Sequence, residues 1–336
     1  MTGGFTLRNV PLLSRVGAER ADALRADAPA LAAGWAEALL LRVDRRGQVL
    51  VRGAQVVLGR ATELGEQPPS DAVLLARLDD GRHVWAVRGE LVAPVDTDDT
   101  GAGDVQVLDL RRGTIIFDDT SAQLVGTATA LLNWHDQARF STDDGSPTTV
   151  SKAGWSRINR LSGREEFPRI DPAIICLVHD GHDWAVLARQ ANWQPRLFSV
   201  LAGFVEAGES FESAVVREIA EEVGLDVTDV TYLGSQPWPF PRSLMVGFQA
   251  LGDPGQPFAF NDGEIAEAHW FTRAQVREAL AHGDWNSAAV SRAAVSRAAG
   301  AGAVEKRPWE NARLLLPGSI SIAREMIESW AAVGLG

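Results

Sequence analysis

Three glutamates recur at close spacing in a segment whose apolar residues have a helical period. Glu218, Glu221 and Glu222 belong to the stretch GFVEAGESFESAVVREIAEEVGL, which runs from Gly203 to Leu225. At about 100° per residue they fall within an arc of roughly 100°, so their carboxylates face the same side of a helix. Carboxylates so placed repel one another unless cations lie between them, and hard divalent ions take oxygen ligands of this kind. The spacing therefore predicts a site for divalent cations such as Mg²⁺.

The helix that must position these glutamates has signals at both ends. Ser210 can cap its first turn, and Gly224 can take the left-handed conformation beyond its last turn. Arg217 is expected to orient the acidic side chains through Glu209, because a guanidinium holds two carboxylate oxygens at a fixed angle. A solvated acidic face is the alternative, but it leaves the flanking glycines unexplained. The apolar face expected to pack on a sheet consists of Val215, Val216, Ile219, Ala220 and Val223.

This arrangement resembles, position for position, the signature of the Nudix hydrolases, which cleave a nucleoside diphosphate linked to another moiety. The resemblance implies an α+β Nudix fold, in which a mixed sheet is sandwiched by helices. It also implies roles for particular residues. These are the metal contacts Ala202 (through its carbonyl), Glu218, Glu221 and Glu222, the catalytic Arg217, Glu218, Glu221 and Glu222, and the structural Gly203, Glu209 and Gly224.

A second segment, SQPWPFPRS, begins at Ser235. Its three prolines exclude a helix interior and predict a stiff loop, whose aromatic and amide groups can meet a flat, polar base at little ordering cost. The segment resembles the motif of the NADH pyrophosphatase branch of the Nudix superfamily, whose members also remove NAD caps from RNA. Arg242 stands where that branch usually has glutamine. The residues expected to contact the substrate are Gln236, Pro237, Trp238, Pro239, Phe240, Pro241, Arg242 and Ser243. The alternative is a rigid surface turn in which Trp238 fills a hydrophobic gap.

The same resemblance extends to positions outside these two segments. Glu264, in the stretch DGEIAEAHW, is expected to complete the metal site, with Glu267 as its competitor. Phe167 and Phe204 occupy the positions where the family sandwiches a substrate ring, although either ring could instead belong to the core. Ala323 lies at the start of the last family helix, where a backbone contact to the substrate would fall.

The region before the signature resembles the zinc ribbon of the family but lacks its ligands. The four ligand positions carry Ser141, Asp144, Asn159 and Ser162. Structural zinc needs thiolates or imidazoles, and the only cysteine of the sequence, Cys176, lies in an apolar run typical of a buried strand. We therefore expect no zinc. Side-chain hydrogen bonds and packing around Trp134 and Trp155 should hold this subdomain together.

Composition limits the partners that the protein can have. The 336 residues carry 32 Lys and Arg against 44 Asp and Glu, a formal charge of −12, which argues against a broad nucleic-acid surface. No run of eighteen apolar residues and no signal peptide is seen, and one buried cysteine fits a reducing compartment. A cytoplasmic protein is expected.

Along the chain, the patterns predict three parts. Residues 1–136 form a strand-rich N-terminal domain, 137–167 a zinc-ribbon-like subdomain without metal ligands, and 168–336 the catalytic domain with a C-terminal helix. The resemblance implies that the first part is a degenerate Nudix-like domain that helps to build a homodimer. Strands are expected at 38–43, 49–51, 73–78, 83–87, 106–110, 173–178 and 184–189, and a helix at 121–135. The acidic stretch 96–104 is expected to be a loop, and the AAVSR repeat within 287–303 a partly helical insert or a mobile loop.

These observations together predict metal-dependent hydrolysis of NAD(H) to nicotinamide mononucleotide and AMP, with NAD caps on RNA as further substrates. Two or more Mg²⁺ or Mn²⁺ ions would act in the site. Glu221, Glu222 and Glu264 remain the candidates for the general base. Two alternatives are a Nudix hydrolase of another nucleoside diphosphate derivative, such as ADP-ribose, and a non-enzymatic nucleotide sensor.

Overall fold

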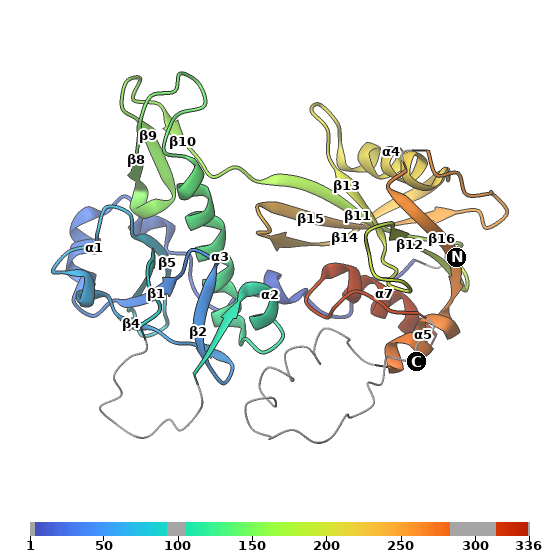
Figure 1. Ribbon diagram of the computed structural model, residues 1–336, viewed down its shortest axis with the longest axis horizontal. Coiled ribbons are helices and arrows are strands. Elements are labelled where there is room, and N and C mark those ends of the chain that lie inside the picture. Colours follow the sequence, from blue (N-terminus) through green and yellow to red (C-terminus); the bar gives the residue numbers. More distant parts are fainter. Residues whose placement is uncertain (1–3, 93–104, 262, 283–313, 335–336) are drawn as a thin grey trace. The chain divides into compact units, whose positions relative to one another are not determined.

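The chain divides by its internal contacts into two compact units, each described by itself below (Figure 1). The computed structural model describes residues 4–92, 105–261, 263–282 and 314–334. The N-terminal unit comprises Leu13–Ile170 and Pro239–Arg242, and the C-terminal unit comprises Met1–Leu12, Asp171–Trp238 and Ser243–Gly336. The predicted loop at 96–104 and the repeat segment at 287–303 lie outside the described residues.

The N-terminal unit is rich in strands, as the alternating apolar runs predicted. One sheet has the order β4-β1-β6-β5, with β1 and β6 parallel, and a second has the order β3-β2-β7. Trp35 and Trp85 fill its core, their rings meeting edge to face at 5.5 Å. The helix α3 is capped by Asp118, whose carboxylate accepts a hydrogen bond from the Ser121 amide at 2.7 Å.

Of the elements in this unit, β3, β4, α1 and α2 were not predicted, and the predicted β1, β2, β5, β6, β7 and α3 have the expected bounds to within two residues. The bounds are β1 Leu39–Val43, β2 Gln48–Arg52, β3 Gln55–Val56, β4 Gly59–Arg60, β5 Val73–Arg77, β6 His83–Arg88, β7 Gln106–Asp109, α1 Ala28–Trp35, α2 Leu110–Gly113 and α3 Asp119–Gln137, with short 3₁₀ turns at Leu12–Ser14, Asp22–Leu24 and Ala61–Leu64.

A small antiparallel sheet, β10-β9-β8, follows α3 in the same unit. Its strands are β8 Thr148–Ser151, β9 Ser156–Asn159 and β10 Glu165–Glu166, with a 3₁₀ turn at Lys152–Gly154. We call residues 137–167, which include this sheet, the ribbon-like segment. The contacts of the chain group it with residues 13–136, whereas the sequence predicted a separate subdomain.

The C-terminal unit is built on a mixed sheet in the order β14-β15-β11-β12-β16, with β13 also paired to β11. Strands β11 and β15 run parallel, and β12, β13, β14 and β16 pair antiparallel with their neighbours. The bounds are β11 Asp171–His179, β12 Trp184–Gln190, β13 Leu201–Phe204, β14 Val227–Trp238, β15 Ser243–Gly252, β16 Ile265–Thr272, α4 Phe211–Val223, α5 Arg273–Ala281 and α7 Ile322–Ala332.

Helices cover both faces of this sheet. Alternate residues of β11 point to opposite sides, and those on each side are apolar and pack against helices. Ile175 and Leu177 pack in a cluster with Trp330 and other residues of α5 and α7. Ile174 and Cys176 pack on the other face, in a cluster that includes the apolar residues of α4. The predicted mixed sheet between helices is therefore confirmed, as is the buried strand position of Cys176.

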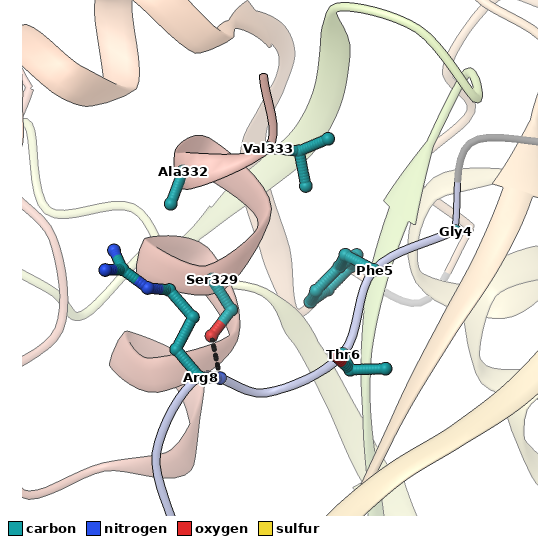
Figure 2. A pocket seen from close by; sticks show the side chains of 7 residues that line it. All are labelled: Gly4, Phe5, Thr6, Arg8, Ser329, Ala332 and Val333. Carbon is teal, nitrogen blue, oxygen red and sulfur yellow. Dashed lines mark hydrogen bonds between the residues drawn. The ribbon is translucent and has the colours of Figure 1, made fainter. Parts of the chain in front are cut away.

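The beginning of the chain belongs to the C-terminal unit rather than to the domain predicted to start there. Phe5 is 5% exposed and joins the cluster around α7, while Gln249 accepts a hydrogen bond from its amide and donates one to its carbonyl. The Arg8 amide donates to the Ser329 hydroxyl at 2.9 Å (Figure 2). A groove of about 600 Å³ lies between this segment and the end of α7, and no predicted site residue lines it.

Candidate active site

Helix α4 begins and ends at the predicted residues. Ser210 accepts a hydrogen bond from the Ser213 amide at 3.2 Å, and Gly224 takes a left-handed conformation with φ of 71°. The buried stripe differs from the prediction at four residues: Ala214 and Glu222 are buried, Val216 is exposed and Ala220 is half-buried. Val216 is 44% exposed and Glu222 is only 2% exposed, because the stripe follows positions i, i+4, i+7 and i+8 from Val215.

Four acidic side chains of this region, Glu209, Glu218, Glu221 and Glu222, form what we call the glutamate cluster, and Arg217 connects the first three of them. Its Nε and Nη2 atoms donate to the two carboxylate oxygens of Glu209 at 2.8 and 2.9 Å. Its Nη1 donates to Glu218 and to Glu221, each at 2.9 Å. This is the bidentate orientation predicted from the sequence, extended to two further carboxylates. Arg217 Nη2 also donates to the carbonyl of Phe204 at 2.9 Å, which ties the cluster to the end of β13; nothing in the sequence signalled this contact.

The carboxyl group of Glu218 lies directly against the backbone of β13. A Cβ atom added at Gly203 would fall 1.9 Å from the Glu218 carboxyl carbon, so only glycine leaves room for it. Burial raises the pKa of Glu218, and the hydrogen bond from Arg217 opposes that rise. For Glu209 the hydrogen bonds from Arg217 and from the Glu206 amide lower the pKa to about 2.

The two glutamates near β16 have different partners. Gln190 donates a hydrogen bond to Glu264 at 2.5 Å, and Glu267 pairs with Arg189 at 3.0 Å. The negative charge of Glu264 also contributes to the raised pKa of Glu218, so the two carboxylates are close enough to repel each other. Within the described residues, no three His, Cys, Asp or Glu side chains converge in a geometry that holds a metal ion. Arg217 instead occupies oxygens of Glu209, Glu218 and Glu221.

The segment predicted to be a loop around Trp238 is mostly strand. Gln236, Pro237 and Trp238 end β14 and pair with the first residues of β15. The prolines misled the prediction, because β14 is an edge strand of the sheet, where a missing backbone N–H is tolerated. Only Pro239–Arg242 form the turn, and these residues cluster with the N-terminal unit.

In that unit the guanidinium of Arg111 lies 4.2 Å from the ring centre of Phe240. Arg111, on α2, is a neighbour of the turn that sequence reasoning missed. A lone arginine on a short helix gives no signal of such a contact.

Phe204 and Phe167 are both 61% exposed, so the alternative that either ring belongs to a core is wrong. Phe204 ends β13 in the C-terminal unit, and Phe167 follows β10 in the N-terminal unit, where the Lys152 ammonium lies 5.6 Å from its ring centre. Both rings therefore present a face that a planar group could stack on.

Comparison with known proteins places this geometry in a family. A family model described as the NUDIX domain matches residues 169–292. The NAD-capped RNA hydrolase NudC of Mycobacterium bovis (strain BCG / Pasteur 1173P2) is 62% identical over 328 residues, which cover 98% of this chain and 97% of that protein. The chain belongs to the Nudix family.

Two more distant relatives of this Nudix protein come from eukaryotes. The mitochondrial NAD(P)H pyrophosphatase NUDT13 of Mus musculus is 37% identical over 223 residues, covering 66% of this chain and 58% of that protein. The chloroplastic Nudix hydrolase 19 of Arabidopsis thaliana is 36% identical over 224 residues, covering 62% of this chain and 51% of that protein. The resemblance found in the glutamate-rich helix and the SQPWPFPRS segment is thus confirmed.

Nudix hydrolases use divalent metals, and the donor set of this Nudix protein suits such ions. Carboxylate and carbonyl oxygens are the ligands that Mg²⁺ prefers. The contact between the Glu218 carboxyl group and Gly203 supports a metal site here, because it holds that carboxylate beside the backbone of Ala202. The carboxylates would have to turn away from Arg217 to converge on an ion.

Three of the four positions where the resemblance places zinc ligands, Asp144, Asn159 and Ser162, are linked by hydrogen bonds. Asn159, 1% exposed, donates to both carboxylate oxygens of Asp144 at 3.0 and 3.1 Å. Its own oxygen accepts from the amides of Leu161 and Ser162 at 2.8 and 3.1 Å. Ser141 Oγ accepts from the Asp143 amide at 3.2 Å. The side chains at these positions thus bond to one another or to nearby backbone amides.

The two tryptophans expected to hold the ribbon-like segment have different surroundings. The Trp155 indole donates to the Leu74 carbonyl at 2.7 Å, and the Arg25 guanidinium lies 3.5 Å from its ring centre. Trp134 stacks obliquely against His135 at 4.7 Å. Trp155 therefore anchors the segment to strand β5 of the same unit.

Ala323 lies at the start of α7 and is 2% exposed. Its amide donates to the hydroxyl of Ser321, the N-cap of that helix, at 3.2 Å. None of the described helices is long and apolar enough to cross a membrane.

Proposed function

We propose that this Nudix protein hydrolyses the pyrophosphate bond of NAD(H), giving nicotinamide mononucleotide and AMP, and removes NAD caps from the 5′ ends of RNA. The observation that carries the proposal is the match, over nearly the whole length of both chains, to a protein named NAD-capped RNA hydrolase. The intact glutamate cluster supports an enzyme rather than a nucleotide sensor, because a sensor has no need of its carboxylates.

The metal site proposed here draws on three parts of the C-terminal unit. Glu218 and Glu222 come from α4, Glu264 precedes β16, and the carbonyl of Ala202 comes from β13, with Glu221 as a further ligand. Two or more Mg²⁺ or Mn²⁺ ions, when bound, neutralise the pyrophosphate oxygens and lower the pKa of the attacking water. Gly203 keeps space open for Glu218, and Gly224 ends the helix so that the cluster stays on its last turns.

In the reaction, a water oxygen attacks one phosphorus of the bridge as the bond from that phosphorus to the bridging oxygen breaks. The water proton passes to a carboxylate, for which Glu221, Glu222 and Glu264 are the candidates. Arg217 orients the cluster through Glu209, the carboxylate with the pKa lowered to about 2. Such a carboxylate stays ionised at neutral pH and holds the guanidinium in place.

The substrate would be bound by exposed rings and by the β14–β15 turn. Phe204 and Phe167 each offer a ring face for stacking on a base. Trp238, the turn residues Pro239–Arg242 and Ser243 supply further contacts, with Arg242 adding a cation, and Ala323 contributes through its backbone. We also propose a homodimer, in support of which Phe140 and Leu161 of the ribbon-like segment are 62% and 79% exposed.

The test is a substrate panel with product analysis in Mg²⁺ and in Mn²⁺. NADH, NAD⁺, ADP-ribose and NAD-capped RNA are compared by kcat/KM, and the expected products of the dinucleotides are nicotinamide mononucleotide and AMP. A higher kcat/KM for ADP-ribose than for both NAD forms would replace the proposed substrate. Turnover of none of the four would support the nucleotide sensor.

The charge of the chain gives an independent check on how RNA is recognised. With a formal charge of −12, affinity should depend on the cap and not on the length of the RNA. Strong, salt-dependent binding of uncapped RNA would contradict this.

A further inference from the structure

Gln236 has no exposed surface, and both polar atoms of its amide are engaged inside the C-terminal unit. Nε2 donates to the carbonyl of Ile320 at 2.8 Å, and Oε1 accepts from the amide of Ile322 at 2.7 Å. A side chain that is wholly buried and so bonded presents no polar atom to a ligand. The expectation that Gln236 hydrogen-bonds a substrate base therefore has no support in its surroundings.

Its two partners flank Ser321, the residue that caps α7. The Gln236 amide therefore hydrogen-bonds the backbone on both sides of Ser321, where α7 begins. Ile320 is 5% exposed and Ile322 is fully buried. A Cβ atom added at Gly247 of β15 would lie only 3.1 Å from Ile322 Cδ1. The start of α7 is accordingly fixed to the β14–β15 pair by two hydrogen bonds and by close packing.

Gln236 lies close to the end of β14, so its hydrogen bonds to α7 also affect the turn that follows the strand. Alternate residues of a strand point to the same face, so Gln236 and Trp238 share a face of β14 and Pro237, which is exposed, points to the other. Only Pro237 lies between Gln236, whose side chain holds α7, and Trp238, which ends the strand. A shift of Gln236 would therefore move the end of β14 against α7.

We propose that Gln236 is a positioning residue that sets the end of β14 against the start of α7, so that groups on these two elements meet a substrate as one surface. The proposal rests on the proposed function only in that the β14–β15 turn faces the substrate. Its structural half concerns the free protein and can be measured without any substrate.

The test compares Gln236→Met with Gln249→Met. Gln249 is a matched control, because it is also nearly buried, and its amide bonds both backbone groups of Phe5 at 3.0 and 2.9 Å. Each change removes two hydrogen bonds to backbone from the same unit, and Gln249→Met also removes the 3.2 Å contact with His179 Nε2, so the control should lose at least as much stability as Gln236→Met. Gln236→Asn, whose amide is one methylene too short to span both partners, serves as a second variant if the first fails to fold.

In the free protein, hydrogen exchange at the Ile322 amide should become about tenfold faster in Gln236→Met and stay unchanged in Gln249→Met. With substrates, Gln236→Met should raise KM for NADH and for NAD⁺ by the same factor, with kcat less affected, while Gln249→Met leaves both constants near those of the unaltered protein. Equal factors are expected because a positioning residue does not discriminate between the two nicotinamide forms.

Two results would overturn the proposal. One is unchanged exchange at Ile322 with a selective loss of one nicotinamide form, which would mean that Gln236 touches the base. The other is faster exchange at Ile322 with no change in KM beyond that of Gln249→Met, which would reduce Gln236 to a stabilising residue. If the protein cleaved no dinucleotide at all, the exchange measurement would still decide whether Gln236 fixes the start of α7. Failure of this proposal and failure of the proposed function are therefore distinguishable.

Discussion

The glutamate cluster at α4 and four residues of the ribbon-like segment, Ser141, Asp144, Asn159 and Ser162, both gather oxygen-bearing side chains, but their charges are balanced differently. In the cluster, Glu209, Glu218 and Glu221 share the single guanidinium of Arg217. In the ribbon-like segment, one carboxylate, Asp144, receives a neutral amide from Asn159 and a backbone amide from Ser146.

The two sets of residues therefore differ in the groups that they can bind. Three carboxylates on one guanidinium keep an excess of negative charge, which further cations can neutralise. A carboxylate paired with amides has its hydrogen bonds satisfied without a metal. The first region is suited to hold divalent ions and the second to hold its own fold.

The largest expected effect comes from Glu222→Gln. The change keeps the shape of this buried side chain but removes its charge, so kcat/KM for NADH should fall by about 10²-fold or more. Steady-state kinetics in Mg²⁺ measures this, with the circular dichroism spectrum and Tm as the check on folding. Activity within a few-fold of the unaltered protein would remove Glu222 from the mechanism and weaken the contrast between the regions.

Metal removal should separate the two regions next. Chelation should abolish turnover and Mg²⁺ or Mn²⁺ should restore it, and an ion at about 100 times its Kd should stabilise the folded protein by about 2.7 kcal/mol. Added zinc or its chelation should leave Tm unchanged, because the ribbon-like segment offers no thiolate. Stoichiometric, chelator-resistant zinc in protein purified without added metal would contradict this half of the comparison.

A smaller effect is expected from Asn159→Asp in the ribbon-like segment. The new carboxylate would face that of Asp144 in place of two donated hydrogen bonds, so stability should fall by about 1–3 kcal/mol. Chemical unfolding measures the loss. The double variant Asp144→Asn with Asn159→Asp restores an amide–carboxylate pair in the opposite sense and should recover most of it. Failure of this swap to recover stability would show that the pair is not what holds the segment.

The parts of this account that the sequence predicted are those that depend on local spacing. The caps of α4 at Ser210 and Gly224 follow from residue type, as does the hydrogen-bonded ion pair between Arg217 and Glu209. Contacts across the fold could not be predicted from spacing. The hydrogen bond from Gln190 to Glu264 joins residues 74 positions apart, and no local pattern encodes it.

The prediction at Pro237 failed for a related reason. Proline excludes a helix interior from its own geometry, but whether it lies in a loop or on an edge strand depends on the order of strands in the sheet. The burial of Val216 and Glu222 was mispredicted for the same reason. The sheet beneath α4 determines which face of the helix packs, so Val216 is exposed and Glu222 is buried.

The smallest expected effect concerns acid stability. The pKa of Glu209 is lowered to about 2, below its value in the unfolded chain, so its contribution to stability is complete above about pH 4.5 and is lost as the pH falls toward 2. Glu209→Gln should therefore lose less stability on acidification than the unaltered protein, as measured by urea unfolding. Asp144→Asn is the matched variant, because hydrogen bonds from Ser146 and Asn159 also lower the pKa of Asp144. Identical acid profiles for Glu209→Gln and the unaltered protein would contradict the pairing with Arg217.

We propose that the glutamates of α4, and not the residues of the ribbon-like segment, hold the divalent ions. Mn²⁺ binding followed by electron paramagnetic resonance tests it directly, on the unaltered protein, on Glu218→Gln with Glu222→Gln, and on Asp144→Asn. The unaltered protein and Asp144→Asn should each bind two or more ions per chain, and the double glutamine variant should lose these ions. Undiminished binding by the double glutamine variant, or loss of binding in Asp144→Asn with its fold intact, would contradict it.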